Sequence, residues 1–248
     1  GIGGSATNDG GAGMVQALGA KLLTRDNQQI GAGGQALESL VRIDVSELDK
    51  RLAGCRIDVA CDVTNPLTGP QGATAVFGPQ KGATAEMIAS LDKALAHFAE
   101  IIHRDLELDV LHLEGGGAAG GMGAGLYAFC GAKLRPGIEI VTDALHLADI
   151  VADADLVITG EGRIDSQTIH GKVPVGVARV AKRYNLPVIA IAGSLTADVG
   201  VVHEHGLDAV FSVIYSICTL DEALENAAEN VRMTARNVAA VLKMGQVL

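Results

Sequence analysis

The chain has 248 residues, 48% of them apolar, which is enough for one large domain or two smaller ones with a sizeable core. A formal net charge of −10 argues against a nucleic-acid partner, and no apolar run approaches the roughly 18 residues of a membrane span. The four cysteines (Cys55, Cys61, Cys130 and Cys218) form no CxxC pair and stand among apolar neighbours, which predicts buried, reduced thiols in a cytoplasmic protein.

The first half of the chain predicts a glycine-rich loop, a strand and several helices. The opening stretch GIGGSATNDGG leads into a helix over 9–20, which Asn8 or Asp9 is placed to cap. Residues 56–66 predict a strand that stops at Asp62 and turns at Asn65 and Pro66. The clearest helix covers 85–104, where apolar residues recur at steps of three and four, and 114–134 predicts a glycine-rich loop that runs into a helix of small residues.

The second half alternates strands and helices. Strands are expected at 154–160, 187–193 and 208–214, with helices at 172–184, around Val201 and His205, and over 220–245, where Thr219 is the expected cap. Continuously apolar strands between helices indicate a parallel sheet covered on both faces. Three strands are few for a doubly wound sheet, so we expect this half-sheet to need strands from elsewhere.

The first candidate site follows the strand at 154–160. In a parallel sheet, ligands bind at the carboxyl ends of the strands, and the stretch EGRIDSQTIHGK there holds Glu161, Arg163, Asp165, Ser166 and Lys172. Arg163 can bind a carboxylate or phosphate through two hydrogen bonds, and Lys172 begins the following helix, whose N-terminal N–H groups also favour anions. Asp165 is a candidate general base or metal ligand. The alternative is a solvated loop held by salt bridges.

Further candidates lie in the first half. Asp62 and Asn65 present oxygens that suit Mg²⁺ or substrate hydroxyl groups, although an Asx turn before Pro66 explains them equally well. Lys81, in the glycine loop FGPQKGAT, is a modest candidate for binding an anion.

The opening loop holds Gly3, Gly4, Ser5, Thr7 and Asn8 directly before a predicted helix. Its glycines allow close backbone approach to an anionic group, but Asp9 would repel a bare anion. The loop therefore favours a ligand that brings a metal ion or a hydroxyl group. GIGGSA also matches the dinucleotide fingerprint, which leaves a dinucleotide-dependent oxidoreductase as an alternative, although the acidic residue expected after a second strand is missing.

Taken in order, the motifs GIGGSATNDGGAGM, CDVTNPL, FGPQKGA, GAAGGMGA and ITGEGRIDSQTIHGKVPVGVA resemble the type I glycerate kinase family of bacteria. The resemblance runs from Gly1 to the last predicted helix. It implies ATP-dependent phosphorylation of D-glycerate, with 2-phosphoglycerate as the expected product and Mg²⁺ as the usual partner. It leaves the oligomeric state open, a homodimer included.

The resemblance also implies an α/β fold of two α/β domains, one inserted in the other. Residues 1–150 would form the latter part of the inserted domain. Residues 151–248 would form the C-terminal half of a discontinuous Rossmann- or flavodoxin-like domain, whose doubly wound parallel sheet is completed by the family's N-terminal segment. Nothing in this chain matches that segment. We therefore expect a piece of a longer protein, which by itself either lacks turnover or binds a ligand or partner without catalysis.

The resemblance suggests roles for the candidate residues. Arg163 and Lys172 would hold anionic oxygens, and Asp165 would orient or deprotonate the acceptor hydroxyl. Asp9 and Asp62 would hold Mg²⁺ or substrate hydroxyls. The remaining candidates for binding substrate or phosphate are Gly3, Gly4, Ser5, Thr7, Asn8, Asn65, Lys81, Glu161 and Ser166.

Overall fold

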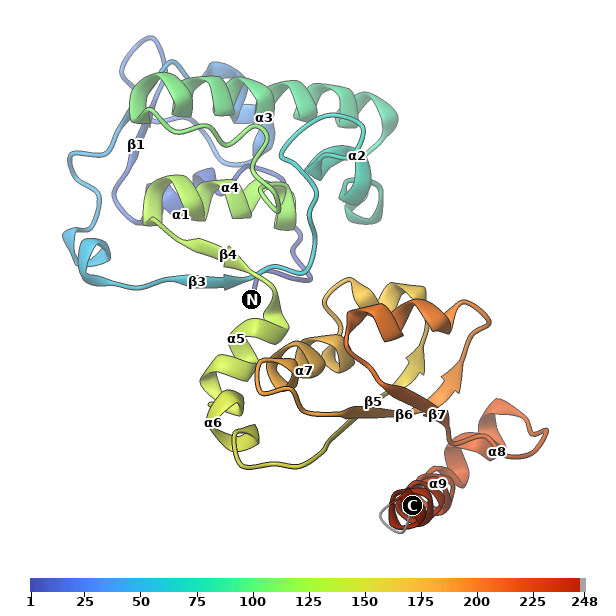
Figure 1. Cartoon of the computed structure of the whole chain (residues 1–248). Helices are drawn as coiled ribbons and strands as arrows, with labels where there is room; N and C mark the ends of the chain where they lie inside the picture. Colours follow the sequence, from blue (N-terminus) through green and yellow to red (C-terminus); the bar gives the residue numbers. More distant parts are fainter. Residues whose placement is uncertain (246–248) are drawn as a thin grey trace. The chain divides into compact units, whose positions relative to one another are not determined.

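The computed structural model describes residues 1–245, and the chain divides into two compact units between Gly137 and Ile138 (Figure 1). The sequence predicts a division into domains near residue 150. In the structure α6 (Leu147–Val151), which follows α5 (Gly137–Ala144), packs against α7 (Val173–Lys182) within the second unit. The α/β class predicted from the sequence is confirmed. None of the described helices is long and apolar enough to span a membrane.

The first unit contains four helices, four strands and three short 3₁₀ helices, the latter labelled η, and it ends at the first residue of α5. They are α1 (Ala12–Ala17), β1 (Lys21–Leu23), η1 (Gly34–Ser39), β2 (Arg42–Asp44), η2 (Lys50–Gly54), β3 (Asp58–Ala60), α2 (Ala73–Phe77), η3 (Pro79–Lys81), α3 (Ala85–Leu106), α4 (Ala118–Cys130) and β4 (Lys133–Arg135). Strands β1 and β2 pair antiparallel, whereas β3 and β4 pair parallel. Because α1 leads into an antiparallel pair, the opening glycines do not form the strand–helix–strand unit of a dinucleotide fold, and that alternative is wrong.

The core of the first unit forms along α3. Thr84 caps this helix by accepting the N–H of Met87, and the periodic apolar residues bury Leu95, Phe98 and Ile102 completely. The ring of Phe98 stacks on that of Phe129 from α4, with centroids 6.2 Å apart. The predicted helix over 85–104 is thus confirmed.

Helix α4 begins with a kink, which the sequence indicated only as a glycine-rich entry. Ala119, Gly120 and Gly121 adopt left-handed backbone conformations inside it. A Cβ on Gly120 would lie 2.0 Å from the carbonyl oxygen of Thr7. The glycine therefore lets the start of α4 approach the opening loop more closely than any side chain would allow.

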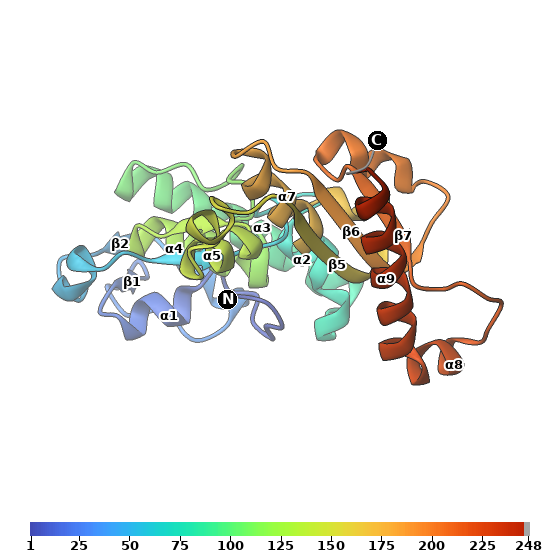
Figure 2. The ribbon, with the colours of Figure 1, turned by 60° about the horizontal axis from the view of Figure 1, so that its bottom comes forward.

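The second unit is a three-stranded parallel sheet with helices on it (Figures 1 and 2). Its remaining elements are β5 (Val157–Ile164), η4 (Ser166–Ile169), β6 (Val188–Leu195), η5 (Val199–His205), β7 (Ala209–Ser212), α8 (Leu220–Glu225) and α9 (Ala227–Gly245). The order is β5-β6-β7, all parallel, as the alternating pattern predicts. Helix α7 packs on β5, and α9 contacts β6 from the opposite face of the sheet.

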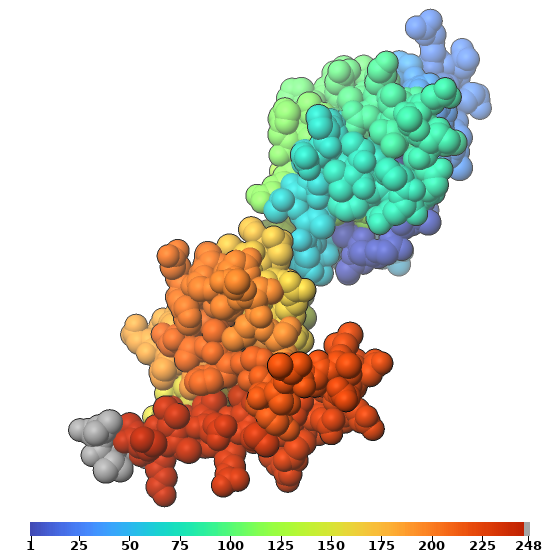
Figure 3. Space-filling view, turned by 90° about the vertical axis from the view of Figure 1, so that its right-hand side faces the viewer, coloured from blue at the N-terminus to red at the C-terminus, as the bar shows by residue number. Residues whose placement is uncertain are grey.

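The face of the sheet that α9 covers is only partly closed. Ile158 of the edge strand β5 pairs with the buried Ile189 but is itself 55% exposed. In the space-filling view, α9 runs along the surface of the unit with its outward side chains projecting (Figure 3). Helix α8 likewise leaves Leu220 and Leu224 exposed.

Several predicted boundaries are wrong. The helix expected over 9–20 is limited to α1, because the backbone at Gly10 and Gly11 is left-handed. The single helix expected over 220–245 breaks into α8 and α9 at Asn226, although its predicted cap is confirmed: Thr219 accepts the N–H of Glu222. The strand expected over 56–66 is only β3, and the short helix near Val201 is the 3₁₀ helix η5.

The prediction for the cysteines is only partly right. All four thiols are free, and Cys130 is buried, but Cys55 and Cys218 are exposed and Cys61 is half-buried. Cys55 lies in the turn after η2, outside the regular core, and Cys218 lies in the exposed link before α8. Apolar neighbours in the sequence therefore do not ensure burial where the backbone is not part of a packed element.

Candidate functional site

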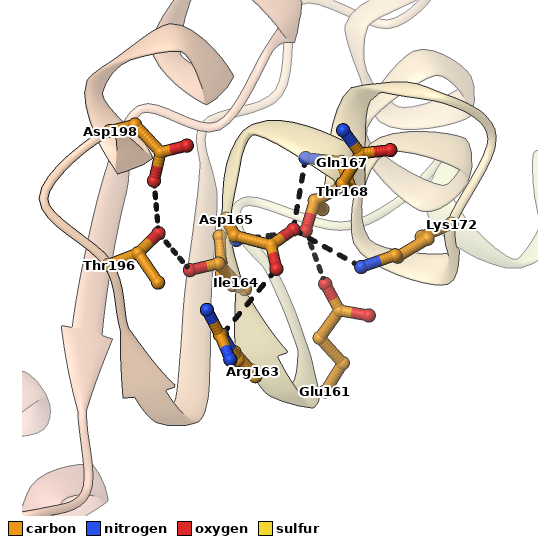
Figure 4. A network of polar contacts seen from close by, with 9 residues as sticks. All are labelled: Glu161, Arg163, Ile164, Asp165, Gln167, Thr168, Lys172, Thr196 and Asp198. Atoms are coloured by element: carbon orange, nitrogen blue, oxygen red, sulfur yellow. Dashed lines mark hydrogen bonds and ion pairs between the residues drawn. The ribbon is translucent and has the colours of Figure 1, made fainter.

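Asp165 lies at the centre of the polar cluster beyond β5 (Figure 4). Its Oδ1 accepts a hydrogen bond from Nζ of Lys172 at 3.2 Å, and its Oδ2 lies 3.5 Å from Nε of Arg163. The sequence expected Glu161 and Arg163 in a loop, but both belong to β5, where they pair with Ala192 and Ser194 of β6. The strand continues through these polar residues because β6 provides backbone partners as far as Leu195.

The surroundings of Asp165 keep its carboxyl group ionised. Partial desolvation by itself would raise its pKa, but the hydrogen bonds from Lys172 and from the backbone N–H of Gln167, with the charges of Lys172 and Arg163, lower the pKa overall. Only 17% of the Asp165 side chain is exposed, compared with 64% for Arg163. Asp165 is thus a fixed anion, and Arg163 is the accessible cation beside it.

Thr168 connects Asp165 to Glu161. Its hydroxyl accepts the N–H of Asp165 at 3.2 Å and donates to Oε1 of Glu161 at 2.7 Å, and the residue is fully buried. Asp165 in turn accepts the N–H of Gln167, which completes a capping box on η4. Sequence reasoning missed Thr168, because a threonine stands in DSQT where the capping-box pattern has Glu or Gln, and only the position of Asp165 as a possible cap was a signal.

A second carboxylate fixes the neighbouring loop. Asp198 accepts hydrogen bonds from the hydroxyls of Ser166 and Thr196, which lower its pKa to about 2. The backbone N–H of Thr196 also donates to the carbonyl oxygen of Ile164 at 3.3 Å. The segments that follow β5 and β6 are therefore tied together at the carboxyl end of the sheet, where ligands of parallel sheets bind.

A second candidate site lies within the first unit. A cavity of about 290 Å³ is lined by the opening loop, the end of β3, η3 and the start of α4, and its lining includes Gly3, Gly4, Ser5, Asp62 and Lys81. Nζ of Lys81 donates to Oγ of Ser5 at 3.0 Å and to the carbonyl oxygen of Thr7 at 2.7 Å. Five of the residues singled out in the sequence thus meet at one cavity, although they come from three separate segments.

The two candidate metal ligands have different surroundings. Asp9 is 8% exposed, and its two oxygens accept the backbone N–H groups of Gly11 and Gly13 at the start of α1. Asp62 is exposed and accepts the N–H of Gly137 at 2.7 Å. Over residues 1–245, no group of three or more His, Cys, Asp or Glu side chains is arranged to hold a metal ion.

The remaining candidates make local contacts. Asn65 donates from Nδ2 to the carbonyl oxygen of Gln71, as expected for a turn residue. Asn8 donates to Oγ1 of the buried Thr74, and its own Oδ1 is buried without a hydrogen-bond partner among the described residues. The predicted site residues therefore fall into two groups, one in each unit.

Comparison with known proteins gives concordant matches. The model of the glycerate kinase family matches residues 1–243. The chain is 64% identical to glycerate 2-kinase of Escherichia coli K12 over 99% of its own length, and 56% identical to glycerate kinase of Bacillus subtilis 168 over its whole length. A crystal structure from Salmonella typhimurium LT2, described as a glycerate kinase 2, matches the whole chain with 74% identity and a TM-score of 0.83.

The chain spans a little less than two thirds of these relatives: 64% of the Escherichia coli protein, 65% of the Bacillus subtilis protein and 64% of the Salmonella chain. Within that span the family motifs quoted from the sequence lie in both units, at the cavity beside Lys81 and at the polar cluster around Asp165. Because the family model covers nearly every residue and the identities far exceed 30%, the chain belongs to the glycerate kinase family.

Proposed function

We propose that the intact protein transfers the γ-phosphoryl group of ATP to D-glycerate and forms 2-phosphoglycerate. The observation that carries the proposal is the match to a relative named glycerate 2-kinase, at 64% identity over 99% of the chain. The polar cluster around Asp165 supports it, because phosphoryl transfer requires fixed charges that neutralise the moving group and orient the acceptor hydroxyl.

Arg163 is the residue proposed to contact the transferred phosphoryl group. It lies at the carboxyl end of β5, and its side chain is 64% exposed. A guanidinium presents several donors in one plane, so it can hold two phosphate oxygens together. Lys172 is closer to Asp165 and contributes a second positive charge from the start of α7.

Asp165 is proposed to accept a hydrogen bond from the acceptor hydroxyl of glycerate. Its lowered pKa keeps the group ionised at neutral pH but also makes it a weak base. Its main contribution would therefore be to aim the hydroxyl in line with the phosphoryl group. Glu161, through its hydrogen bond with Thr168, would hold the segment that carries Asp165.

Magnesium is proposed to enter with ATP, where it would neutralise phosphate charge. Mg²⁺ at phosphate sites keeps several waters and takes only one or two carboxylates from the protein. Asp62 fits this requirement, because it is exposed and its orientation is fixed by the N–H of Gly137. Asp9 fits it less well, since both of its oxygens hold backbone amides, and we assign it to stabilising the opening loop.

The test is a product assay on the intact protein with ATP, Mg²⁺ and D-glycerate. Phosphorus NMR distinguishes phosphate on the 2-hydroxyl from phosphate on the 3-hydroxyl. We expect ATP-dependent formation of 2-phosphoglycerate, with L-glycerate as the control for stereochemical selection. Exclusive formation of 3-phosphoglycerate would contradict the proposed regiochemistry, and binding of ATP and glycerate without any transfer would contradict the proposed activity.

A further inference from the structure

Lys81 forms no ion pair in the part of the chain that the structure describes. Its two hydrogen bonds go to neutral oxygens, the hydroxyl of Ser5 and the carbonyl of Thr7. Among the residues that the structure describes, no carboxylate lies within salt-bridge distance of its Nζ. Partial burial lowers the pKa of Lys81, and the charge of Asp9 offsets this only in part. A half-buried ammonium group held in this way is stabilised when an anion binds beside it.

The cavity that Lys81 lines is small. Its volume of about 290 Å³ lies just below the range for small-molecule sites, about 300–1,000 Å³. The lining also provides apolar contacts from Ile2, Val63 and Phe77. These dimensions suit a short carbon skeleton better than a nucleotide, which requires room for a base, a ribose and a chain of phosphates.

The charges at the cavity also favour a small acid. One lysine and one aspartate, Lys81 and Asp62, are the charged residues among its described lining. A monoanion with hydroxyl groups can place its carboxylate at Lys81 and leave its neutral groups near Asp62, where the Mg²⁺ carried by ATP would also be held.

The backbone of the opening loop leaves space for such a ligand. A Cβ built on Gly3 or Gly4 would meet no heavy atom within 4 Å, in contrast to Gly120, whose Cβ would collide with the backbone. These two glycines therefore line open space, and a bound acid can approach their peptide groups closely.

We propose that this cavity binds the carboxylate of the hydroxy acid, at Lys81, and that the nucleotide lies outside the cavity. The inference rests on the proposed function for the identity of the acid. It goes further by assigning the two substrates to different sites and by naming the residue that recognises the acid.

Calorimetric titration of the intact protein with D-glycerate, glycerol and metal-free ATP tests the assignment. We expect D-glycerate to bind, and glycerol, which lacks the carboxylate, not to bind. Lys81→Met should weaken D-glycerate binding at least about tenfold, as expected for the loss of a charge-assisted hydrogen bond. It should leave the affinity for ATP unchanged. The matched control is Lys93→Met, which removes an exposed lysine of α3 and should change neither affinity.

A second measurement needs no substitution. Cys61 lines the cavity and is half-buried, whereas Cys55 is exposed outside it. Bound D-glycerate should slow alkylation of Cys61 by iodoacetamide and leave the rate at Cys55 unchanged, as followed by peptide mass spectrometry. Glycerol at the same concentration should protect neither thiol.

Three results would overturn the assignment: no binding of D-glycerate, an equal effect of Lys81→Met and Lys93→Met, or a loss of ATP binding in Lys81→Met with D-glycerate binding intact. Failure of this assignment can be distinguished from failure of the proposed function. If D-glycerate binding depends on Lys81 but the unsubstituted protein transfers no phosphate, the assignment of the site is supported and the proposed activity is contradicted. If the Lys81→Met variant phosphorylates glycerate normally, the proposed activity is supported and the assignment of Lys81 to glycerate binding is contradicted.

Discussion

Nζ of Lys172 donates a hydrogen bond to Oδ1 of Asp165 at 3.2 Å, so the first residue before α7 fixes the carboxylate that follows β5. The pair is formed within one loop of the chain, and the second oxygen of Asp165 faces Arg163 at 3.5 Å. These two cationic neighbours hold the carboxylate in place. Asp165 can therefore orient a substrate hydroxyl only while it keeps both its negative charge and this position.

Asp165→Asn should therefore lower kcat, and added Mg²⁺ should not restore it. The loss of a positioned base or hydroxyl acceptor is typically about 10²–10⁴-fold. The matched variant is Asp62→Asn, in which the new amide oxygen can still accept the N–H of Gly137 while the charge is lost. Its activity should recover in part as Mg²⁺ is raised at saturating ATP and glycerate. Rescue of the Asp165 variant by metal would reverse these roles.

Arg163→Ala should reduce kcat/KM by about 10- to 100-fold, the effect expected for the loss of a charge-assisted contact to a phosphoryl group. Arg179→Ala is the control, because Arg179 is also exposed and forms a surface pair with Glu139 at 3.0 Å. Steady-state kinetics of both variants under identical conditions make the comparison. Equal losses would show that Arg163 has no special place in the reaction.

Thr168→Val should destabilise the second unit and disturb the site. The substitution keeps the shape of the buried side chain but leaves Glu161 and the N–H of Asp165 without their partner. For a fully buried group such a loss costs about 1–3 kcal/mol of the free energy of unfolding, and these two groups are partly buried, so we expect a cost at the lower end. Thr168→Ser retains the hydroxyl and should recover most of that loss and of kcat. Urea unfolding and kinetics check both; a serine variant as impaired as the valine variant would assign the effect to packing of the methyl group.

The stability of the protein should acquire a pH dependence from Asp198. Its pKa is lowered from 3.8 to about 2, so the hydrogen bonds from Ser166 and Thr196 contribute fully above about pH 4. The contribution is lost as the pH falls through about 2. In Asp198→Asn, the Tm difference from the unsubstituted protein should be constant from pH 7 to about 4.5 and shrink below pH 4. A difference that grows in acid would contradict the direction of the pKa shift.

Gly125→Ala should destabilise the first unit, because the added Cβ would lie 2.4 Å from the backbone carbonyl oxygen of Gly10. Forcing a methyl group into such a contact costs about 1–3 kcal/mol or more of the free energy of unfolding. Gly54→Ala is the control, since a Cβ there meets nothing within 4 Å. Chemical denaturation monitored by circular dichroism measures both. Equal midpoints would mean that the backbone moves apart at little cost.

Elements with strong local signals could be predicted from the sequence. Helix α3 follows from its apolar periodicity, and the parallel order β5-β6-β7 follows from apolar strands alternating with helices. The pairing of β3 with β4 could not be predicted, because Asp58 and Lys133 are distant in the sequence and each strand has only three residues. The antiparallel pair β1–β2 was missed for the same reason: three-residue strands carry too little pattern.

The sequence allowed the residue types of the candidate site to be predicted, but not the contacts between them. Arg163, Asp165 and Lys172 were found because charged residues follow an apolar strand, and the structure brings them together. The connection from Thr168 to Glu161 depends on burial of one hydroxyl, which no local pattern reports beyond the capping box. Lys81 reaches Ser5 across 76 positions, so only the folded first unit places the two at one cavity.

The unpaired side of β5 also has a consequence for how the sheet of the second unit is completed. Among the described residues β5 is paired only on its β6 side, and it exposes Ile158 next to an unpaired row of backbone groups. An unpaired strand edge is a template on which a further strand can add. This side of β5 is therefore open to the additional strands that the half-sheet predicted from the sequence requires.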